Sequence, residues 1–438
     1  MTSLVEDLNS LHFIVRVGGK TRVGTDGDGK GNPLPLELST FQDFKDWYYG
    51  RTISLKRTDP ETGAEEMLAI PIAKYWLSHS EARRYRGITF DPSRKEDGDV
   101  YNIWRGFAVP PVQGDWSLFR THLKENVCDG EEEVFGYVLR WMAYAVQHPE
   151  RPAEVALVVR GAKGTGKGTF ANAFGRLFTP HYLAISNRSH LTGRFNAHLM
   201  QTVVLFVDEG FWAGDREGEG VLKQLITEPE LPIERKFFDV EHVPNRLHVI
   251  IASNESWVVP ARGLERRFLV VNVNDRHARD TAYFGAIWKQ LQAGGYSAML
   301  FDLLAMDLSD FEVRRVPMTD ALQEQMLHSL TSFEAWWFGR LMDGALLVGR
   351  SGWGDVALDA LHGGYMHEAE GKHTLSKQQF VAELDRMLPP PGAQLAMALS
   401  PLGRMVKTLS VPGVVECRKE WERQRGIKVK WLKGEADG

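Results

Sequence analysis

A glycine-rich stretch near the middle of the chain has the residue types that bind phosphate. Residues 160–170 read RGAKGTGKGTF, and Gly161, Gly166 and Lys167 match the spacing G-x-x-x-x-G-K after the apolar run 155–160. In the order strand, glycine loop, helix, backbone N–H groups converge on phosphate oxygens and the helix adds the positive end of its dipole. The stretch therefore predicts a phosphate-binding loop, made by Gly161, Gly164, Thr165, Gly166, Lys167, Gly168 and Thr169.

One position departs from the usual form of such a loop. A Ser or Thr normally follows the lysine and ligates Mg²⁺, whereas this chain has Gly168. The metal must then depend on water, on Thr169 or on a carboxylate elsewhere. A plain turn before a helix over about 168–178 is one alternative. A dinucleotide-binding loop that began at Gly164 would need a glycine at position 169, where the sequence has Thr169, so this alternative is weaker.

A pair of acids follows the next apolar run. Asp208 and Glu209 come directly after residues 203–207, which read VVLFV. At the end of a buried strand, Asp208 would hold Mg²⁺ through water, and Glu209 would orient and activate an attacking water. The alternative is a capping or turn element without a catalytic role.

Two further polar groups lie beside later strands. Asn254 closely follows the run 247–252, and its amide could hydrogen-bond both an attacking water and a terminal phosphate. Arg266 and Arg267 directly precede the run 268–273, and a guanidinium neutralises charge on a phosphoryl group in transfer. Arg262 is a further candidate. Turn formation by Asn254 and surface ion pairs of the arginines are the alternatives.

Residues 231–243 predict a β-hairpin with a cationic tip. Lys236 lies at the tip beside aromatic residues, and His242 lies on the returning arm. Cations hold phosphates and rings stack on bases, so this hairpin suits single-stranded DNA. A solvated hairpin face is the alternative.

Composition limits the class of protein. The chain has 438 residues, 43% of them apolar and 25% charged, with a net charge of −5, which indicates two or three globular domains. Its two cysteines exclude a disulfide scaffold. The sequence has no run of 18 apolar, uncharged residues and no signal-peptide pattern, so we expect no membrane contact and a cytoplasmic location.

The apolar runs predict an α/β core with buried strands near 155–160, 203–207, 247–252 and 268–273. We expect four regions, which are a mixed α/β region 1–114, a helical collar 115–150, a nucleotide-binding core 151–310 and a C-terminal region 311–438. The last is expected to be mostly helical with a terminal strand in 425–434. Its segment 404–433 holds nine Lys and Arg against three Glu, so it is either a nucleic-acid face or a solvated surface. Residues 375–388, which read LSKQQFVAELDRML, and the terminal strand pattern suggest a winged-helix-like DNA module, and a packing domain is the alternative.

The order GAKGTGKGT, VVLFVDE, ERKFFDVEHVPN, IIASN, ERRF resembles the superfamily three helicases of viruses and phages. More narrowly, it resembles the helicase part of phage, plasmid and poxvirus primase-helicases. Residues 102–116 and 140–161 share this similarity, which covers about 100–275.

The resemblance implies a P-loop AAA+-like core, a homo-hexameric ring, ATP and Mg²⁺ at the site, and ATP-driven translocation on single-stranded DNA. It also implies roles for particular residues. Asp208 and Glu209 match the acidic pair, Asn254 the sensor, Arg266 or Arg267 an arginine finger from the adjoining subunit, and Lys236 the DNA-contacting hairpin. About 100 residues precede the similarity, too few for a primase domain, so we expect a separate primase or polymerase partner.

Two other functions remain open at this point. One is an ATP-gated ring that binds or loads onto DNA without unwinding it. The other is a nucleoside monophosphate kinase, whose family resembles GTGKGT with glycine after the lysine but needs no acidic pair followed by Asn254 and paired arginines.

Overall fold

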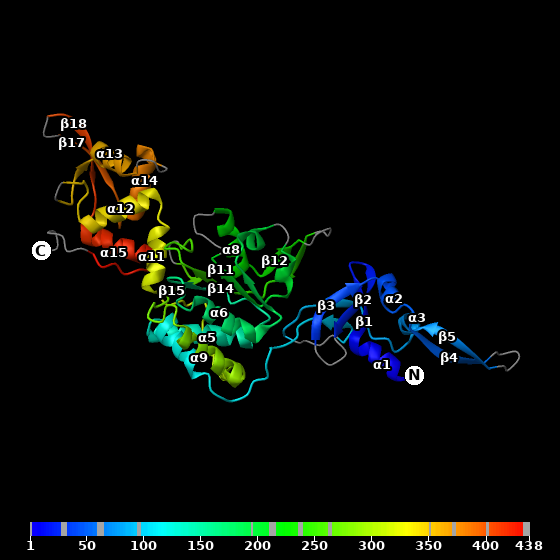
Figure 1. Ribbon diagram of the computed structural model, residues 1–438. Helices are drawn as coiled ribbons and strands as arrows, with labels where there is room; N and C mark the ends of the chain where they lie inside the picture. The colour runs from blue at the N-terminus through cyan, green and yellow to red at the C-terminus, as the bar shows by residue number, and fades with distance from the viewer. Residues whose placement is uncertain are drawn as a thin grey trace.

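The computed structural model is elongated, with an N-terminal region, a central core and a C-terminal region in chain order (Figure 1). The structure describes residues 2–27, 33–58, 65–93, 98–193, 196–209, 216–234, 240–261, 265–349, 352–369, 374–399 and 403–431. Within these residues, no helix is long and apolar enough to cross a membrane.

The N-terminal region is built on a mixed sheet of order β3-β2-β1-β6. The first two strands form a hairpin with Gly18 and Gly19 at positive φ in the turn. Helices pack on this sheet around the fully buried Trp76, and the hairpin β4–β5 projects from it (Figure 1). The elements are α1 (Thr2–Leu11), β1 (His12–Val17), β2 (Lys20–Gly27), β3 (Pro33–Ser39), α2 (Phe41–Trp47), β4 (Thr52–Thr58), β5 (Glu65–Pro71), α3 (Ile72–Ser78), β6 (Arg84–Tyr85), β7 (Gly87–Thr89) and β8 (Val100–Asn102).

The central core is a parallel sheet of order β10-β11-β14-β9-β15. The four strands predicted from apolar runs are confirmed as β9 (Ala156–Arg160), β11 (Val204–Asp208), β14 (His248–Ser253) and β15 (Phe268–Asn272). The sequence prediction missed β10 (Tyr182–Ile185), because this edge strand is short and mostly half-exposed, and so carries little apolar pattern. The connections contain α6 (Lys167–Gly175), η2 (Arg176–Phe178), α7 (Arg188–Thr192), η3 (Ala197–Gln201), α8 (Arg216–Thr227), β12 (Glu230–Ile233) and β13 (Glu241–Pro244).

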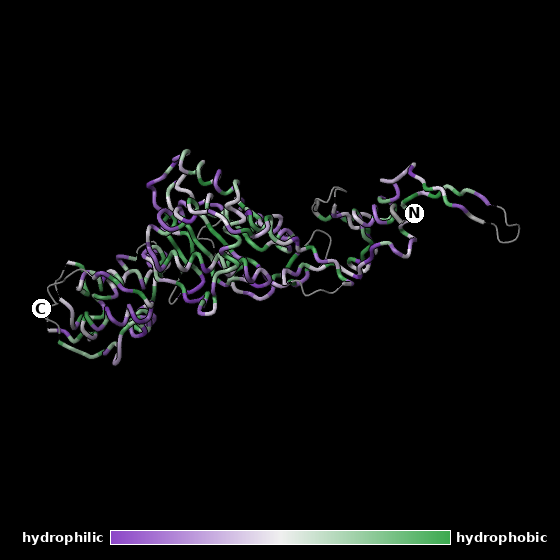
Figure 2. Tube along the Cα trace, turned by 90° about the horizontal axis from the view of Figure 1, so that it is seen from below, coloured by the Kyte–Doolittle hydropathy of each residue, from purple (hydrophilic) through white to green (hydrophobic). Residues whose placement is uncertain are grey.

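Helical layers cover both faces of this sheet, and the apolar residues gather in the central strands (Figure 2). Leu157 and Val159 pack with α5 and α6, whereas Ala156 and Val158 pack with α8 on the other face. The first layer also holds α4 (Ser117–Thr121), the π-helix η1 (His122–Val127), α5 (Glu132–Gln147), α9 (Thr281–Gln290), η4 (Leu291–Gly295) and α10 (Tyr296–Ala305).

The side chains proposed for a collar belong to α5. They lie in the core of their own chain beside α10: Phe135, Val138, Leu139, Met142 and Val146. A collar contact with neighbouring subunits therefore stays a prediction and would need other surface residues.

The C-terminal region differs from the sequence prediction in two ways. Besides helices it contains a small antiparallel sheet of order β16-β18-β17, which the sequence analysis did not identify. Its elements are α11 (Asp320–His328), α12 (Ser332–Asp343), β16 (Val356–Ala357), α13 (Leu358–Glu368), α14 (Lys377–Met387), β17 (Gln394–Leu399), β18 (Met405–Ser410) and α15 (Val414–Arg425). A winged-helix-like module in this region, and its contact with DNA, stay predictions.

The second difference is at the C-terminal end, where the prediction of a strand in 425–434 is wrong. Helix α15 continues to Arg425, and the described residues after it pair with no strand. The Glu422 carboxylate takes the place of a strand partner, because it accepts hydrogen bonds from the N–H of Val429 at 2.9 Å and from the indole of Trp431 at 3.1 Å.

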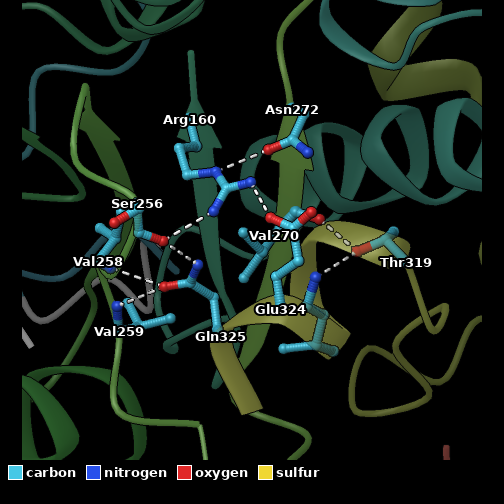
Figure 3. A network of polar contacts seen from close by, with 10 residues as sticks. Arg160, Ser256, Val258, Val259, Val270, Asn272, Thr319, Glu324 and Gln325 are labelled. Atoms are coloured by element: carbon cyan, nitrogen blue, oxygen red, sulfur yellow. Dashed lines mark hydrogen bonds and ion pairs between the residues drawn. The ribbon is translucent and has the colours of Figure 1, made fainter. Parts of the chain in front are cut away.

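A polar network joins α11 to the core (Figure 3). The side chain of Gln325 is fully buried, and it accepts hydrogen bonds from the N–H groups of Val258 at 2.6 Å and Val259 at 3.2 Å. Its amide donates to the carbonyl of Ser256 at 2.7 Å. Helix α11 thus provides hydrogen-bond partners for the buried backbone groups of the segment that follows β14.

The substitution Gln325→Ala should lower the free energy of unfolding by at least about 2 kcal/mol, because it leaves buried backbone groups without partners. Gln323→Ala is the matched control, since Gln323 lies on the same helix and its side chain forms no hydrogen bond with the described residues. Chemical denaturation of both variants measures the difference, and equal unfolding midpoints would contradict the network's role.

Candidate active site

A pocket of about 610 Å³ opens at the carboxyl ends of β9, β11 and β14. The chain passes from β9 through α6 to β10 at one edge of the sheet, whereas β15 lies on the other side of β9. Ligands of open α/β sheets bind in the crevice at such a switch point. The lining residues are Lys163, Gly164, Gly166, Lys167, Gly168, Thr169, Asp208, Glu209, Asn254, Arg279, Thr281, Phe284, Gly285 and Trp288.

The glycine loop 161–166 forms one wall of this pocket and requires glycine at position 166. Gly166 has φ of 99°, and a Cβ there would lie 2.6 Å from the ring of His122 and 2.8 Å from that of Phe284. The positive φ and the close approach each exclude a larger residue. Gly161 and Thr165 belong to the loop but do not line the pocket, and the Thr165 hydroxyl donates within the loop to the carbonyl of Ala162 at 2.9 Å.

The π-helix η1 packs against the glycine loop and stabilises it. The amide of Asn126 donates to the carbonyl of Thr165 at 2.8 Å, and His122 lies against Gly166. Burial lowers the pKa of His122 to about 4, so its ring is neutral near pH 7. The sequence analysis missed this pair. The sequence HLKENV also holds Lys124 and Glu125, so no apolar pattern singled out His122 and Asn126.

The ammonium of Lys167 is held by three acceptors. It donates to the carbonyls of Gly161 at 2.6 Å and Ala162 at 2.8 Å, and to the side-chain oxygen of Asn254 at 2.7 Å. These bonds use all three ammonium donors of a side chain that is only 7% exposed. Burial lowers the pKa of Lys167, and the charges of Glu209 and Asp208 oppose that shift.

Asn254 also connects this lysine to the acidic pair. Its amide nitrogen donates to the Glu209 carboxylate while its oxygen accepts from Lys167. Glu209 has φ of 55°, which is uncommon for a residue with a side chain, and its N–H donates to the carbonyl of Ala252 at 2.9 Å. This turn directs the carboxylate across the pocket. The structure therefore brings together Lys167, Glu209 and Asn254, as the sequence predicts.

Asp208 and Thr169 supply the oxygen atoms that a magnesium ion would need. Both line the pocket, and neither side chain hydrogen-bonds to the described residues. Burial raises the pKa of Asp208, Glu209 raises it further, and Lys167 opposes the shift. Mg²⁺ usually takes one or two protein ligands and completes its shell with water and phosphate oxygens. These donors fit that chemistry without an oxygen at Gly168.

The two predicted arginines lie at the amino ends of the strands of the central sheet, whereas the pocket lies at the carboxyl ends. The N–H of Ala156, the first residue of β9, donates to the carbonyl of Arg267 at 2.8 Å. The pocket lies beyond the other end of this five-residue strand, roughly 15 Å away. The guanidinium of Arg267 pairs with the buried Glu265 at 2.8 Å, whereas Arg266 is exposed. Arg262 lies outside the described residues.

A different arginine lines the pocket. Arg279 has φ of 64°, and its N–H donates to the carbonyl of Gly164 at 2.9 Å. The sequence analysis missed Arg279, since it lies in no motif and reaches the loop only through the fold.

The hairpin predicted to contact DNA is described only in its arms. Strands β12 and β13 pair antiparallel, with Pro232 opposite His242, as predicted. The His242 ring is exposed, and its Nδ1 lies 4.0 Å from the Glu230 carboxylate. Lys236 lies outside the described residues, so DNA contact by Lys236 and His242 stays a prediction.

Comparisons with known proteins match the region of this site. Residues 159–267 match the model of a family of unknown function (DUF5906). Over 270 residues the chain is 25% identical to the DNA Primase-polymerase of Nitratiruptor phage NrS-1, and the match covers 57% of this chain and 37% of that protein. The chain thus spans well under half the length of this relative.

Two structures of the apo C-terminal region of the NrS-1 protein cover nearly all of the chain. One covers 93% of this chain and 98% of its own with a TM-score of 0.66, and the other covers 92% and 96% with a TM-score of 0.62. The chain shares the fold of that C-terminal region. At 16% identity, this likeness shows the fold alone.

The substitution Gly166→Ala should lower the free energy of unfolding by about 1–3 kcal/mol, since the new Cβ meets two rings at positive φ. In Gly168→Ala the nearest atom to the new Cβ is the Asn172 amide nitrogen at 3.6 Å, so stability should stay the same or rise slightly. Chemical denaturation compares the two variants. If Gly166→Ala is as stable as the wild type, the loop is not held as described.

Proposed function

We propose that the chain is an ATP-driven, ring-forming DNA helicase that translocates on single-stranded DNA during phage or mobile-element replication. The observation that carries this proposal is the contact path Lys167–Asn254–Glu209 across the mouth of the glycine loop. In our proposal the central sheet is a P-loop AAA+-like core, and the pocket binds ATP with Mg²⁺.

Nucleotide binding would change the partners of Lys167. A triphosphate in the loop offers charged oxygens, which are stronger acceptors than the carbonyls of Gly161 and Ala162. When the ammonium turns to the phosphates, Asn254 loses its contact with Lys167. Asn254 can then position the attacking water together with Glu209, which accepts the proton of that water. The state of the nucleotide is thus transmitted to the end of β14.

Asp208 and Thr169 would hold Mg²⁺, directly or through water. The ion supplies positive charge that stabilises the phosphate oxygens during transfer. The chain's own contribution is to place these donors beside Lys167, on the side of the pocket where the triphosphate enters.

The arginine finger would come from an adjoining copy. A cationic side chain at the far edge of the sheet cannot reach the pocket of its own chain, but a head-to-tail ring brings that edge to the next pocket. Arg266 is the better candidate, because it is exposed while Arg267 already pairs with Glu265. A homo-hexamer is the assembly we propose.

The proposed DNA contact is the hairpin β12–β13 in the central channel of the ring. The NrS-1 relative is a DNA primase-polymerase, which is an enzyme of DNA replication. A primase-polymerase synthesises DNA on a single-stranded template, and a helicase exposes such a template. We propose that a separate primase or polymerase supplies this activity.

Two substitutions in the pocket should separate nucleotide binding from hydrolysis. Lys167→Ala should lose nucleotide binding, since the phosphates lose their cation, whereas Glu209→Gln should bind ATP but lose turnover, since no base remains. Equilibrium binding and phosphate release measure both effects. Normal hydrolysis by Glu209→Gln would contradict the assigned base.

Strand displacement on forked DNA tests the helicase function itself. The wild type should displace the strand with ATP, and Lys236→Ala should lose displacement while it keeps its ATPase activity. A wild type whose ATPase responds to DNA without displacement would instead be an ATP-gated DNA-binding or loading ring. Acceleration of ATP consumption by AMP alone, with formation of ADP, would indicate a nucleoside monophosphate kinase.

Mixed rings test the arginine. Arg266→Ala should lower turnover by roughly 10³-fold or more while it leaves ATP binding unchanged. Mixed with Lys167→Ala, it should regain part of the activity, because Lys167→Ala copies still offer Arg266 to intact pockets. Arg267→Ala is the control for loss of the nearby ion pair. If the mixture has no more ATPase activity than the separate variants, Arg266 does not act on the pocket of an adjoining copy.

A further inference from the structure

Helix α9 forms an apolar wall of the pocket. Thr281, Phe284, Gly285 and Trp288 line the pocket from this helix, and their spacing of three and four places them on one face. The pocket is therefore divided. Its polar side carries the groups that bind phosphate, and its α9 side has no assigned role.

Trp288 stands at the boundary between this pocket and a second one. The second pocket measures about 580 Å³, and Trp288 lines it together with residues that include Asn172, Arg176, Tyr182 and Gln292. Phe284 packs edge-on against His122 and Tyr283, with ring centroids 5.7 and 5.2 Å apart. Among the described residues, in contrast, no ring or cation contacts the half-buried indole of Trp288. The indole packs against the apolar core and also lines both pockets, so the part of its surface that faces them is available to a ligand.

Gly285 adds an independent observation. A Cβ at this position has no atom within 4 Å, so neither packing nor a special backbone angle requires glycine here. Glycine inside a helix costs roughly 0.5–1 kcal/mol relative to alanine. A side chain at 285 would project into the open pocket beside Trp288. The glycine therefore keeps space free one helical turn before the indole.

We infer that the indole of Trp288 binds the purine base of the nucleotide by stacking, with the sugar beside Gly285. This inference rests on the proposed function, since the loop must hold the phosphates for the base to reach α9. A base stacks on an aromatic side chain through its flat face. A purine covers more of the indole than a pyrimidine does, so the site takes purine nucleoside triphosphates in preference to pyrimidine ones.

Binding measurements with two probes test the subsite on the full chain. Titration calorimetry in the presence of Mg²⁺ compares ATP, GTP and CTP with inorganic tripolyphosphate, which has the phosphates but no base. The wild type should bind ATP and GTP more tightly than CTP. Trp288→Ala should weaken ATP binding roughly tenfold and leave tripolyphosphate binding unchanged, and Trp288→Phe should restore most of the loss.

A second variant keeps the test valid if Trp288→Ala fails to fold. In Gly285→Leu the new Cβ has no atom within 4 Å and the side chain takes up space in the pocket, so it should weaken ATP binding while tripolyphosphate still binds. Gly363→Leu is the matched control, because Gly363 is an exposed glycine of α13 that also has no atom within 4 Å of a new Cβ.

The outcomes distinguish the subsite from the proposed function. If Gly285→Leu and a folded Trp288→Ala bind ATP like the wild type, while Lys167→Ala does not, the base subsite is wrong and the phosphate loop stands. Equal affinity of the wild type for CTP and ATP would overturn the purine preference. A wild type that binds neither ATP nor tripolyphosphate would overturn the proposed function and the subsite with it.

Discussion

The hydrogen bond between Lys167 and Asn254 is the contact on which the candidate site depends. A buried ammonium must have acceptors, because burial without partners is costly. Two of its three acceptors are carbonyls of the loop, and the third is provided only if β14 lies next to β9. The parallel register of these strands therefore determines that the loop lysine meets a side chain 87 residues away in sequence. The acidic pair joins the same group from β11, on the other side of β14.

The segment after β14 is held from two directions. Asn254 faces the pocket, while two residues later the carbonyl of Ser256 accepts hydrogen bonds from Arg160 and Gln325, each at 2.7 Å (Figure 3). Arg160 ends β9, also donates to Asn272 of β15 at 2.8 Å, and forms an ion pair with Glu324 of α11. A shift of Asn254 must therefore either be absorbed within two residues or move α11. Packed polar networks of this kind carry a displacement because their groups cannot lose partners one at a time without cost.

The sequence revealed those parts of the site that directly follow a strand of the central sheet. The G-x-x-x-x-G-K spacing, the acids after 203–207 and Asn254 all follow apolar runs, and a parallel sheet brings the ends of such runs to one edge. His122, Asn126 and Arg279 escaped this reasoning, because each reaches the loop from a segment that is not part of the sheet. The position of α9 also depends on tertiary packing, so the wall with Trp288 could not be found from spacing.

The C-terminal strand prediction failed for a related reason. Alternation was present at Ile427, Lys428 and Val429, but alternation does not supply a partner strand, and Glu422 satisfies the backbone instead.

The two edges of the central sheet, at the carboxyl and the amino ends of its strands, carry different groups. The carboxyl edge carries the loop, the acids and Asn254, and the amino edge carries Arg266 and the Arg267–Glu265 pair. Any role of these arginines in phosphate chemistry needs a second copy, because β9 separates them from the pocket of their own chain. A contact between an amino edge and a carboxyl edge joins unlike surfaces, so each copy keeps one free edge of each kind. Such heterologous contacts close only as a ring and otherwise continue as a filament. A two-fold dimer would complete these pockets with these arginines only if the amino end of each sheet lay against the carboxyl end of the other at the same time.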